Sequence, residues 1–171
     1  TTILGSNPSA PAKKMNIFSA KIKSIKKKLF PFYKSKELNL VFDILEEAKP
    51  KERQVAMFVG GCVRKYLDKH KVDDIDIATI FTPEEIKIKF KKIKEVRVVE
   101  TGVEHGTVTL LLKDLKLEIT TLRKDITTDG RHAEVAFTNN WKEDSERRDF
   151  TINAIYMDRK GKIFDPQSGV K

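Results

Sequence analysis

Residues 106–121 read GTVTLLLKDLKLEITT, and this stretch decides the fold. Apolar and branched residues fill both halves, and in the second half Leu115, Leu117 and Ile119 alternate with polar residues. A period of two is typical of a strand with one buried face, and the polar Lys113-Asp114 pair is typical of a tight turn. The stretch therefore predicts two antiparallel strands at 106–112 and 115–121, with a third expected at 96–99.

The sequence around this hairpin combines helical and strand patterns. Apolar spacing predicts a helix over residues 38–45, and Thr82-Pro83-Glu84-Glu85 has the N-cap, proline and acids typical of a helix start. The other expected elements are strands at 55–59, 75–77, 135–137, 154–157 and 163–164, helices at 62–69 and 144–153, and a loop at 127–131. These elements predict a small α/β (α+β) fold with one mixed sheet and flanking helices. The strands are too few and too irregularly spaced for a doubly wound fold.

The excess of positive charge lies in an N-terminal arm. Residues 1–36 hold nine lysines and no acidic residue, whereas residues 37–171 hold 25 basic and 25 acidic residues, so the net charge of +9 comes from the arm alone. A lysine-rich arm can bind RNA phosphates, but a solvated tail explains it as well, and an organelle-targeting remnant is a further alternative. We expect a basic, flexible arm at 1–36 and a folded domain at 37–171.

Cysteine content and hydropathy exclude several classes. The single Cys62 excludes an intrachain disulfide and a cysteine-only metal site, and it favours a reducing compartment. No apolar run approaches the roughly 18 residues that a membrane-spanning helix needs. We expect a cytoplasmic protein without a membrane partner, or an organellar one if the arm is a targeting remnant.

Acidic residues alternate at the strand expected over 75–77. Asp74 and Asp76 are two positions apart, so on a strand their carboxylates point to the same face. Such neighbours repel each other unless a cation lies between them, and oxygen ligands suit Mg²⁺. Glu118 points away from its apolar neighbours and can complete a set of three acids. Taken separately, an exposed acidic turn and a surface glutamate explain the same residues.

A glycine pair separates the strand expected at 55–59 from the helix expected at 62–69. Gly60-Gly61 lets a ligand approach the backbone closely, and Arg64, one turn later, can contact a phosphate. An ordinary turn is the more frequent reason for such a pair.

A second polar cluster begins at Arg147. Arg147 and Arg148 suit a triphosphate, while Asp149 and Asn153 suit ribose hydroxyls. If this segment is helical, Arg147 and Asn153 lie within about two turns of each other. The alternative is a surface salt-bridge cluster, which is common on charged helices.

Six stretches in this order resemble class II tRNA nucleotidyltransferases. They are FVGGCVR at 58–64, DIDIAT at 74–79, TG with HGT at 101–107, EITTLR at 118–123, DGRH at 129–132 and RRDFTINA at 147–154. This family comprises the CCA-adding enzymes and their bacterial poly(A) polymerase relatives, within the polymerase β-like nucleotidyltransferase superfamily. The resemblance covers about residues 53–170 and implies the head domain of such an enzyme.

The resemblance implies a role for each matching position. It implies that Asp74 and Asp76 bind the metal and that Glu118 is the third catalytic carboxylate. The residues implied in nucleotide binding are Gly60, Gly61, Arg64, Arg147, Arg148, Asp149 and Asn153. A flexible loop, tied in this family to addition of the terminal A, is implied at Arg123, Asp125, Asp129, Arg131 and His132. Lys65 departs from the pattern, because the family usually has an aspartate there.

The implied activity is Mg²⁺-dependent transfer of CMP and AMP from CTP and ATP to the 3′ end of tRNA. Two alternatives remain: a poly(A) polymerase head that uses ATP on RNA 3′ ends, and a truncated head that binds nucleotide or metal without competent catalysis. The family's neck, body and tail, with the base-selecting Glu-Asp-x-x-Arg motif of the neck, are expected beyond Lys171. Residues 143–147 fit that motif, but they lie upstream of RRDFTINA, and we interpret the match as coincidence.

Overall fold

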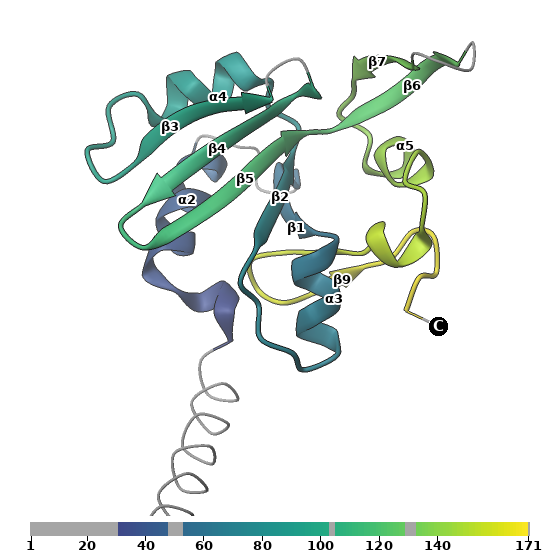
Figure 1. The fold of residues 1–171 in the computed structure, drawn as a ribbon, viewed down its shortest axis with the longest axis horizontal. Helices are drawn as coiled ribbons and strands as arrows, with labels where there is room; N and C mark the ends of the chain where they lie inside the picture. Colours follow the sequence, from purple (N-terminus) through teal and green to yellow (C-terminus); the bar gives the residue numbers. More distant parts are fainter. Residues whose placement is uncertain (1–30, 48–52, 103–104, 129–132, 171) are drawn as a thin grey trace, which may run out of the picture.

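The computed structural model describes residues 31–47, 53–102, 105–128 and 133–170. Its elements in chain order are η1 (Phe32–Lys34), α2 (Lys36–Glu46), β1 (Ala56–Val59), α3 (Gly61–Leu67), β2 (Ile75–Thr79), α4 (Pro83–Phe90), β3 (Arg97–Gly102), β4 (Thr107–Leu112), β5 (Leu115–Thr121), β6 (Arg123–Thr128), β7 (Ala133–Phe137), α5 (Trp141–Glu146), η3 (Thr151–Asn153), β8 (Tyr156–Met157) and β9 (Ile163–Phe164). The expected fold class is confirmed: strands and helices form one mixed α/β unit (Figure 1).

A central sheet contains most of the strands. Within the described ranges, seven strands pair in the order β3-β4-β5-β2-β1-β8-β9. The hairpin expected at 106–121 is confirmed as β4 and β5, which pair antiparallel from Thr107↔Thr120 to Leu112↔Leu115. The neighbouring β2 and β5 run parallel, and the other pairs in the sheet are antiparallel. The parallel pair lies at the middle of the sheet.

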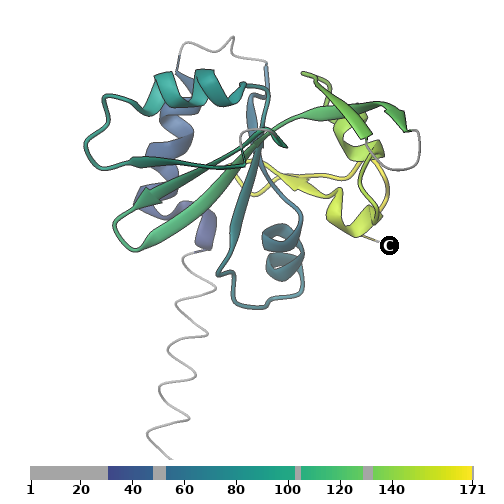
Figure 2. The ribbon, with the colours of Figure 1, turned by 45° about the horizontal axis from the view of Figure 1, so that its top comes forward.

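The helices α2 and α4 cover one face of this sheet (Figure 2). Ser35 caps α2 by accepting a hydrogen bond from the backbone N–H of Leu38. Thr82 and Glu85 form the capping box of α4, as expected for the Thr-Pro-Glu-Glu start. The two helices contact each other, and their apolar sides are buried with Phe58 and Ile77 of the sheet. The main core therefore lies between these helices and the sheet.

The folded part begins before the boundary expected at residue 36. Phe32 and Tyr33 belong to η1, and their rings make edge-to-face contacts with Tyr66 of α3. Tyr33 is buried, with 8% of its surface exposed. These aromatic side chains bury apolar area against the core. The many lysines of residues 1–36 gave no sign of this packing.

The opposite face of the sheet is only partly covered. Residues alternate between the two faces of a strand, so Met57, Val59 and Ala78 form a smaller apolar cluster on this second face. Asp76 and Glu118 alternate with buried aliphatic residues on β2 and β5 and point away from α2 and α4. The second face is therefore where the acidic residues are presented.

A separate two-stranded sheet extends from the end of β5. The strands β6 and β7 pair antiparallel from Arg123↔Phe137 to Thr128↔Ala133, and they lie with α5 at the end of the molecule opposite β3 (Figure 1). Arg123 and Asp125, which were expected in a flexible loop over 123–132, lie in the paired strand β6, and the role expected of this segment stays a prediction. The polar composition concealed this strand, since neither of its faces is apolar in sequence.

The helix expected over 144–153 ends early. The helix α5 stops at Glu146, Arg147 is its C-cap, and the short η3 follows only at Thr151. Arg147 and Asn153 are therefore not on one helix, although the side chains of Arg147 and Arg148 still turn back to the same buried carboxylate. The closing hairpin is confirmed as β8 and β9. Among the described helices, none is both long and apolar enough to cross a membrane.

Candidate active site

Two acidic residues meet across the central parallel pair. Asp76 of β2 and Glu118 of β5 are register partners, so their side chains project from adjacent positions on the second face. Burial raises the pKa of Asp76, and the negative charges of Glu118 and Asp74 raise it further. The three carboxylates are therefore close enough to repel one another, and Asp76 is the one most shielded from water.

The outer two carboxylates each have a lysine beside them. Lys65 Nζ lies 3.5 Å from Asp74 Oδ2 and also pairs with Asp73, while Lys116 Nζ lies 3.3 Å from Glu118 Oε1. Asp74 is highly exposed, with 88% of its side chain accessible. In the described part of the chain, no three His, Cys, Asp or Glu side chains are grouped so as to enclose a metal ion.

The donor set nevertheless fits a divalent cation in its chemistry. Carboxylate oxygens are the ligands that Mg²⁺ prefers, and the repulsion that raises the pKa of Asp76 is relieved when a cation binds. Asp76 and Glu118 already lie side by side, and Asp74 directly precedes β2. These three residues would hold the metal.

The turn after β1 presents open backbone next to this face. Gly60 has φ 69°, a left-handed conformation that favours glycine. A Cβ at Gly61 would meet no atom within 4 Å, so a ligand can approach the backbone there. Arg64, on the first turn of α3, donates from Nη1 to Asn153 Oδ1 at 3.0 Å. This bond joins the glycine turn to η3, which follows α5.

The arginine pair converges on a single buried acid. Arg147 donates from Nε and Nη2 to Asp144 Oδ1, and Arg148 donates from Nε and Nη2 to Asp144 Oδ2, all at 2.8–3.2 Å. Asp144 itself has 0% of its surface exposed. Burial alone would raise its pKa, but Arg148 and Arg147, with the Tyr156 hydroxyl, outweigh burial and lower it. Asp144 therefore stays ionised.

Arg148 connects the arginine pair with the acidic face. Its positive charge acts on Asp76 and opposes the rise in the pKa of that carboxyl. Its Nη1 also lies 3.4 Å from the carbonyl oxygen of Asn153. The structure thus brings the acidic face, Arg148, Asn153, Arg64 and the glycine turn together, although they come from segments far apart in the sequence.

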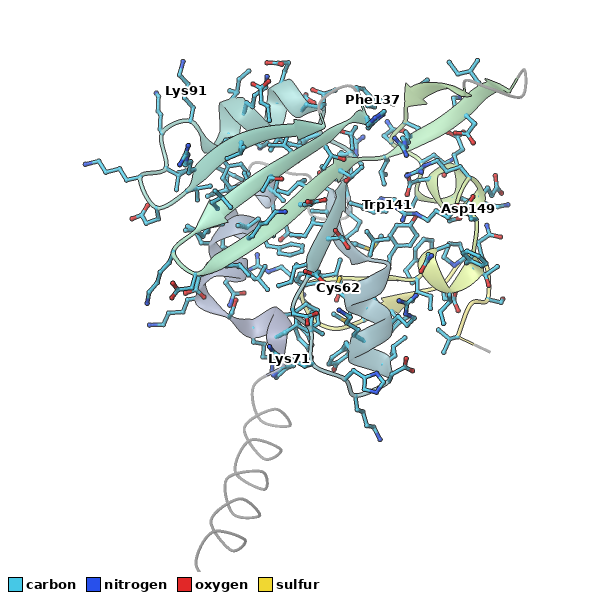
Figure 3. The ribbon with its side chains drawn as sticks, in the orientation of Figure 1. Cys62, Lys71, Lys91, Phe137, Trp141 and Asp149 are labelled. Atoms are coloured by element: carbon cyan, nitrogen blue, oxygen red, sulfur yellow. The ribbon has the colours of Figure 1, made fainter. Side chains whose placement is uncertain are left out.

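Other residues expected in the site lie at its margin. Asp149 is exposed on the turn after the arginine pair, beside α5 (Figure 3). Arg123 donates from Nη1 to the carbonyl oxygen of His105, and its Nε is the one buried side-chain nitrogen or oxygen without a partner among the described residues. Asp125 is exposed on β6. Asp129, Arg131 and His132 lie outside the described residues.

Two residues that support the site could not be identified from sequence patterns. Asp144 looks like one acid among several on a charged helix, and only the tertiary contacts reveal its burial. Cys62 donates its thiol to the carbonyl oxygens of Val59 and Asp76, at 3.3 and 3.6 Å, and so ties α3 to β2 at the site. Burial raises the pKa of Cys62 to about 11, so the thiol stays protonated and acts as a structural donor.

Comparison with known families agrees with this fold. A profile described as the poly A polymerase head domain matches residues 56–171, which is more than half of the chain. The matched segment contains the glycine turn, the acidic strands and the arginine pair. The chain therefore belongs to the poly A polymerase head-domain family.

The names of individual relatives are more specific than the description of the family. The chain is 45% identical over 125 residues to CCA tRNA nucleotidyltransferase 1, mitochondrial, of Homo sapiens, which covers 73% of this chain and 29% of the relative. It is 42% identical over 143 residues to the CCA-adding enzyme of Enterococcus faecalis, covering 79% of this chain and 34% of the relative. The chain thus spans about a third of the length of these relatives.

Solved structures show the same likeness. The Bacillus stearothermophilus CCA-adding enzyme in complex with CTP matches with a TM-score of 0.61 and 36% identity, over 79% of this chain and 31% of that one. A tRNA nucleotidyltransferase complexed with a primer tRNA and an incoming ATP analog matches with a TM-score of 0.52 and 31% identity, over 68% and 32%.

Proposed function

We propose that this chain is the catalytic head of a CCA-adding tRNA nucleotidyltransferase, which transfers CMP and AMP from CTP and ATP to the 3′ end of tRNA. The named relatives carry this activity in their names, and the solved structures were obtained with CTP, a primer tRNA and an ATP analog. The observation that carries the proposal is the register pairing of Asp76 with Glu118, beside Arg148.

Different polar residues bind the phosphates, the ribose and the metal. Arg148 and Arg147 face the triphosphate with guanidinium N–H groups, and the open backbone at Gly61 accepts a close phosphate approach. Asn153, held by Arg64, lies where the ribose enters. The chemistry supplied by Mg²⁺ at Asp74, Asp76 and Glu118 is neutralisation of the triphosphate charge and activation of the attacking hydroxyl. Catalysis then rests on positioning, and no side-chain base is needed.

The test combines binding by this chain with transfer by a chimera. Calorimetry measures binding of CTP and ATP to the 171-residue chain in MgCl₂. For transfer, residues 56–170 replace the matching segment of the Enterococcus faecalis relative, so that the rest of that enzyme is supplied. The chimera is assayed on tRNA that lacks its CCA end, with and without Asp76→Asn. We expect CCA addition by the chimera and a loss of at least about 1,000-fold in turnover with Asp76→Asn.

The outcomes separate the candidate functions. Addition of long tails from ATP alone would select the poly(A) polymerase function instead, which the family description favours. Nucleotide binding by the chain without transfer by the chimera would select the binding-only head. Turnover by the Asp76→Asn chimera equal to that of the parent chimera would refute the assignment of the carboxylates. Lys69→Gln, in the exposed turn after α3, serves as a control that keeps activity.

A further inference from the structure

Asp144 accepts more hydrogen bonds from the protein than a surface carboxylate does. Its two oxygens accept six: from Nε and Nη2 of Arg147, from Nε and Nη2 of Arg148, from the hydroxyl of Tyr156 at 2.7 Å and from the backbone N–H of Arg123 at 3.1 Å. The two arginines are themselves mostly buried, with 13% and 16% of their side chains exposed. A carboxylate with all its lone pairs in use cannot contact a ligand.

The geometry of these bonds sets the direction of both guanidinium groups. Each arginine uses the same edge, Nε with Nη2, and each edge binds one oxygen of Asp144. The Nη1 edges therefore point away from the carboxylate. Arg148 Nη1 is directed toward the carbonyl oxygen of Asn153, at the margin of the acidic face. One buried carboxylate thus orients two donor groups at once.

Positive charge exceeds negative charge around this carboxylate. Arg147 and Arg148 bind Asp144 directly, and the Arg123 guanidinium lies close enough that the charges of all three residues act on it. Burial lowers the pKa of Arg123, and Arg147 lowers it further. Asp125 is a second acid that acts on Arg123, so three cations face two anions, and the remaining positive charge suits a polyanion such as a nucleoside triphosphate.

We propose that Asp144 is a positioning residue: it fixes the guanidinium groups of Arg147 and Arg148 toward the nucleotide triphosphate and ties them to the start of β6 through the Arg123 N–H. This inference rests on the proposed function, because it specifies how that site holds its nucleotide. Asp144 acts through the arginines and does not touch the nucleotide.

The two kinds of substitution at this position have different consequences. In Asp144→Asn one oxygen becomes an NH₂ group, which faces the N–H groups of Arg147 or Arg148 as donor against donor. One guanidinium must then turn away from its present direction. Asp144→Glu keeps the charge but moves the carboxylate by one methylene. Tyr156→Phe removes only the hydroxyl bond and leaves both arginine pairs in place.

The experiment measures nucleotide binding by the 171-residue chain and its variants. Calorimetry in MgCl₂ gives the dissociation constants of CTP and CMP, and circular dichroism gives the folded fraction and Tm. We expect CTP to bind at least about tenfold more weakly to Asp144→Asn, with Asp144→Glu between that variant and the wild type. CMP, which lacks the β and γ phosphates, should weaken by less than about threefold. Tyr156→Phe should lower Tm yet leave CTP affinity within about twofold.

Each result bears on the inference. Equal CTP affinity of Asp144→Asn and wild type, or a loss in Tyr156→Phe as large as in Asp144→Asn, would assign Asp144 a structural role only and overturn it. If Asp144→Asn does not fold, Asp144→Glu decides: weakened CTP binding at a Tm close to that of the wild type supports positioning, and unchanged binding overturns it. Absence of CTP and ATP binding by the wild-type chain overturns the inference, whereas transfer by the chimera decides the proposed function separately.

Discussion

Asp76 and Asp144 are two shielded carboxylates with opposite electrostatic surroundings. Burial and the charges of Glu118 and Asp74 raise the pKa of Asp76, whereas the arginine pair lowers the pKa of Asp144 despite its burial. Asp144 already has its cations within the protein. Asp76 has mainly anions beside it, so its ionised form is stabilised by a cation from outside. The same residue type thus has its charge balanced by arginines at one position and lies beside further acids at the other.

The lowered pKa of Asp144 predicts a specific pH dependence of stability. A carboxyl group whose pKa is lower in the folded state contributes stability above its unfolded pKa of about 3.9, and this contribution is lost as the pH falls through the folded value. We expect Asp144→Asn to lower the free energy of unfolding by about 3–5 kcal/mol at pH 7. The difference from wild type should narrow below about pH 4. Urea denaturation at a series of pH values measures both.

Tyr156→Phe provides the control for this dependence. It removes one hydrogen bond, which should lower the free energy of unfolding by about 1–2 kcal/mol, and it leaves the carboxylate and both arginines in place. Its stability should therefore keep the acid dependence of the wild type. A difference between Asp144→Asn and wild type that stays constant down to pH 2 would contradict the assigned charge of Asp144.

At the scale of elements, the β6–β7 hairpin is attached to the central sheet at few points. The backbone N–H of Thr138 donates to Leu122, and Arg123 donates from Nη1 to the carbonyl oxygen of His105. The ring of Phe137, at the end of β7 (Figure 3), lies against Gly106 at the start of β4. A Cβ at Gly106 would come within 2.7 Å of this ring, and φ there is +79°. The glycine is what lets the hairpin pack closely.

Gly106→Ala is therefore expected to loosen the hairpin. The positive φ and the contact with Phe137 both oppose a side chain, and we expect a loss of about 1–3 kcal/mol in the free energy of unfolding. Gly102→Ala is the matched control, because its Cβ would make an ordinary 3.6 Å contact with Thr107. Thermal unfolding and proteolysis of β6–β7 measure the effect. Equal stability of the two variants would contradict the packing role of Gly106.

The elements show which patterns sequence alone could predict. Alternation of apolar residues predicts β4 and β5, because one face of each strand is buried in the main core. The polar strand β6 has no such alternation, so only its pairing with β7 reveals it. The end of α5 at Glu146 could not be predicted for a different reason: residues 147–153 contain no glycine or proline that would signal the end of a helix.

The candidate site also has features that the sequence could predict and features that it could not. The side of the sheet that Glu118 faces follows from its apolar neighbours, and its pairing with Asp76 agrees with that expectation. The burial of Asp144 depends on Tyr156 and Arg123, which are distant in sequence, so a local pattern cannot predict it. The contact of Lys65 with Asp74 depends likewise on how α3 packs beside β2. The assigned roles in nucleotide and metal binding stay predictions.

For the whole molecule, charge is distributed unevenly along the chain. The nine lysines of residues 1–36 account for the full net charge of +9, while the folded remainder is balanced. The local surplus around Asp144 is therefore compensated elsewhere in that remainder.

Removing the charge of the arm should change RNA binding and leave nucleotide binding unchanged. Seven lysines lie within residues 1–30, and replacing them all by glutamine keeps the length of the chain. We expect weaker tRNA binding and a smaller slope of log K against log salt, by about 0.7–0.9 for each phosphate that the arm no longer neutralises. Filter binding over a range of KCl concentrations measures the slope, and calorimetry with CTP is the control. An unchanged slope would identify the arm as a solvated tail.

The parallel pairing of β2 with β5 also determines when Asp76 and Glu118 come together during folding. Parallel neighbours cannot be joined by a tight turn, and here α4, β3 and β4 form the connection between them. Asp76 and Glu118 therefore meet only after this connection has closed, and closing a long segment is entropically slow. A chain that has formed only its local hairpins holds each carboxylate but not the pair. The pairing of Asp76 with Glu118 thus reports that the segment from β2 to β5 has folded.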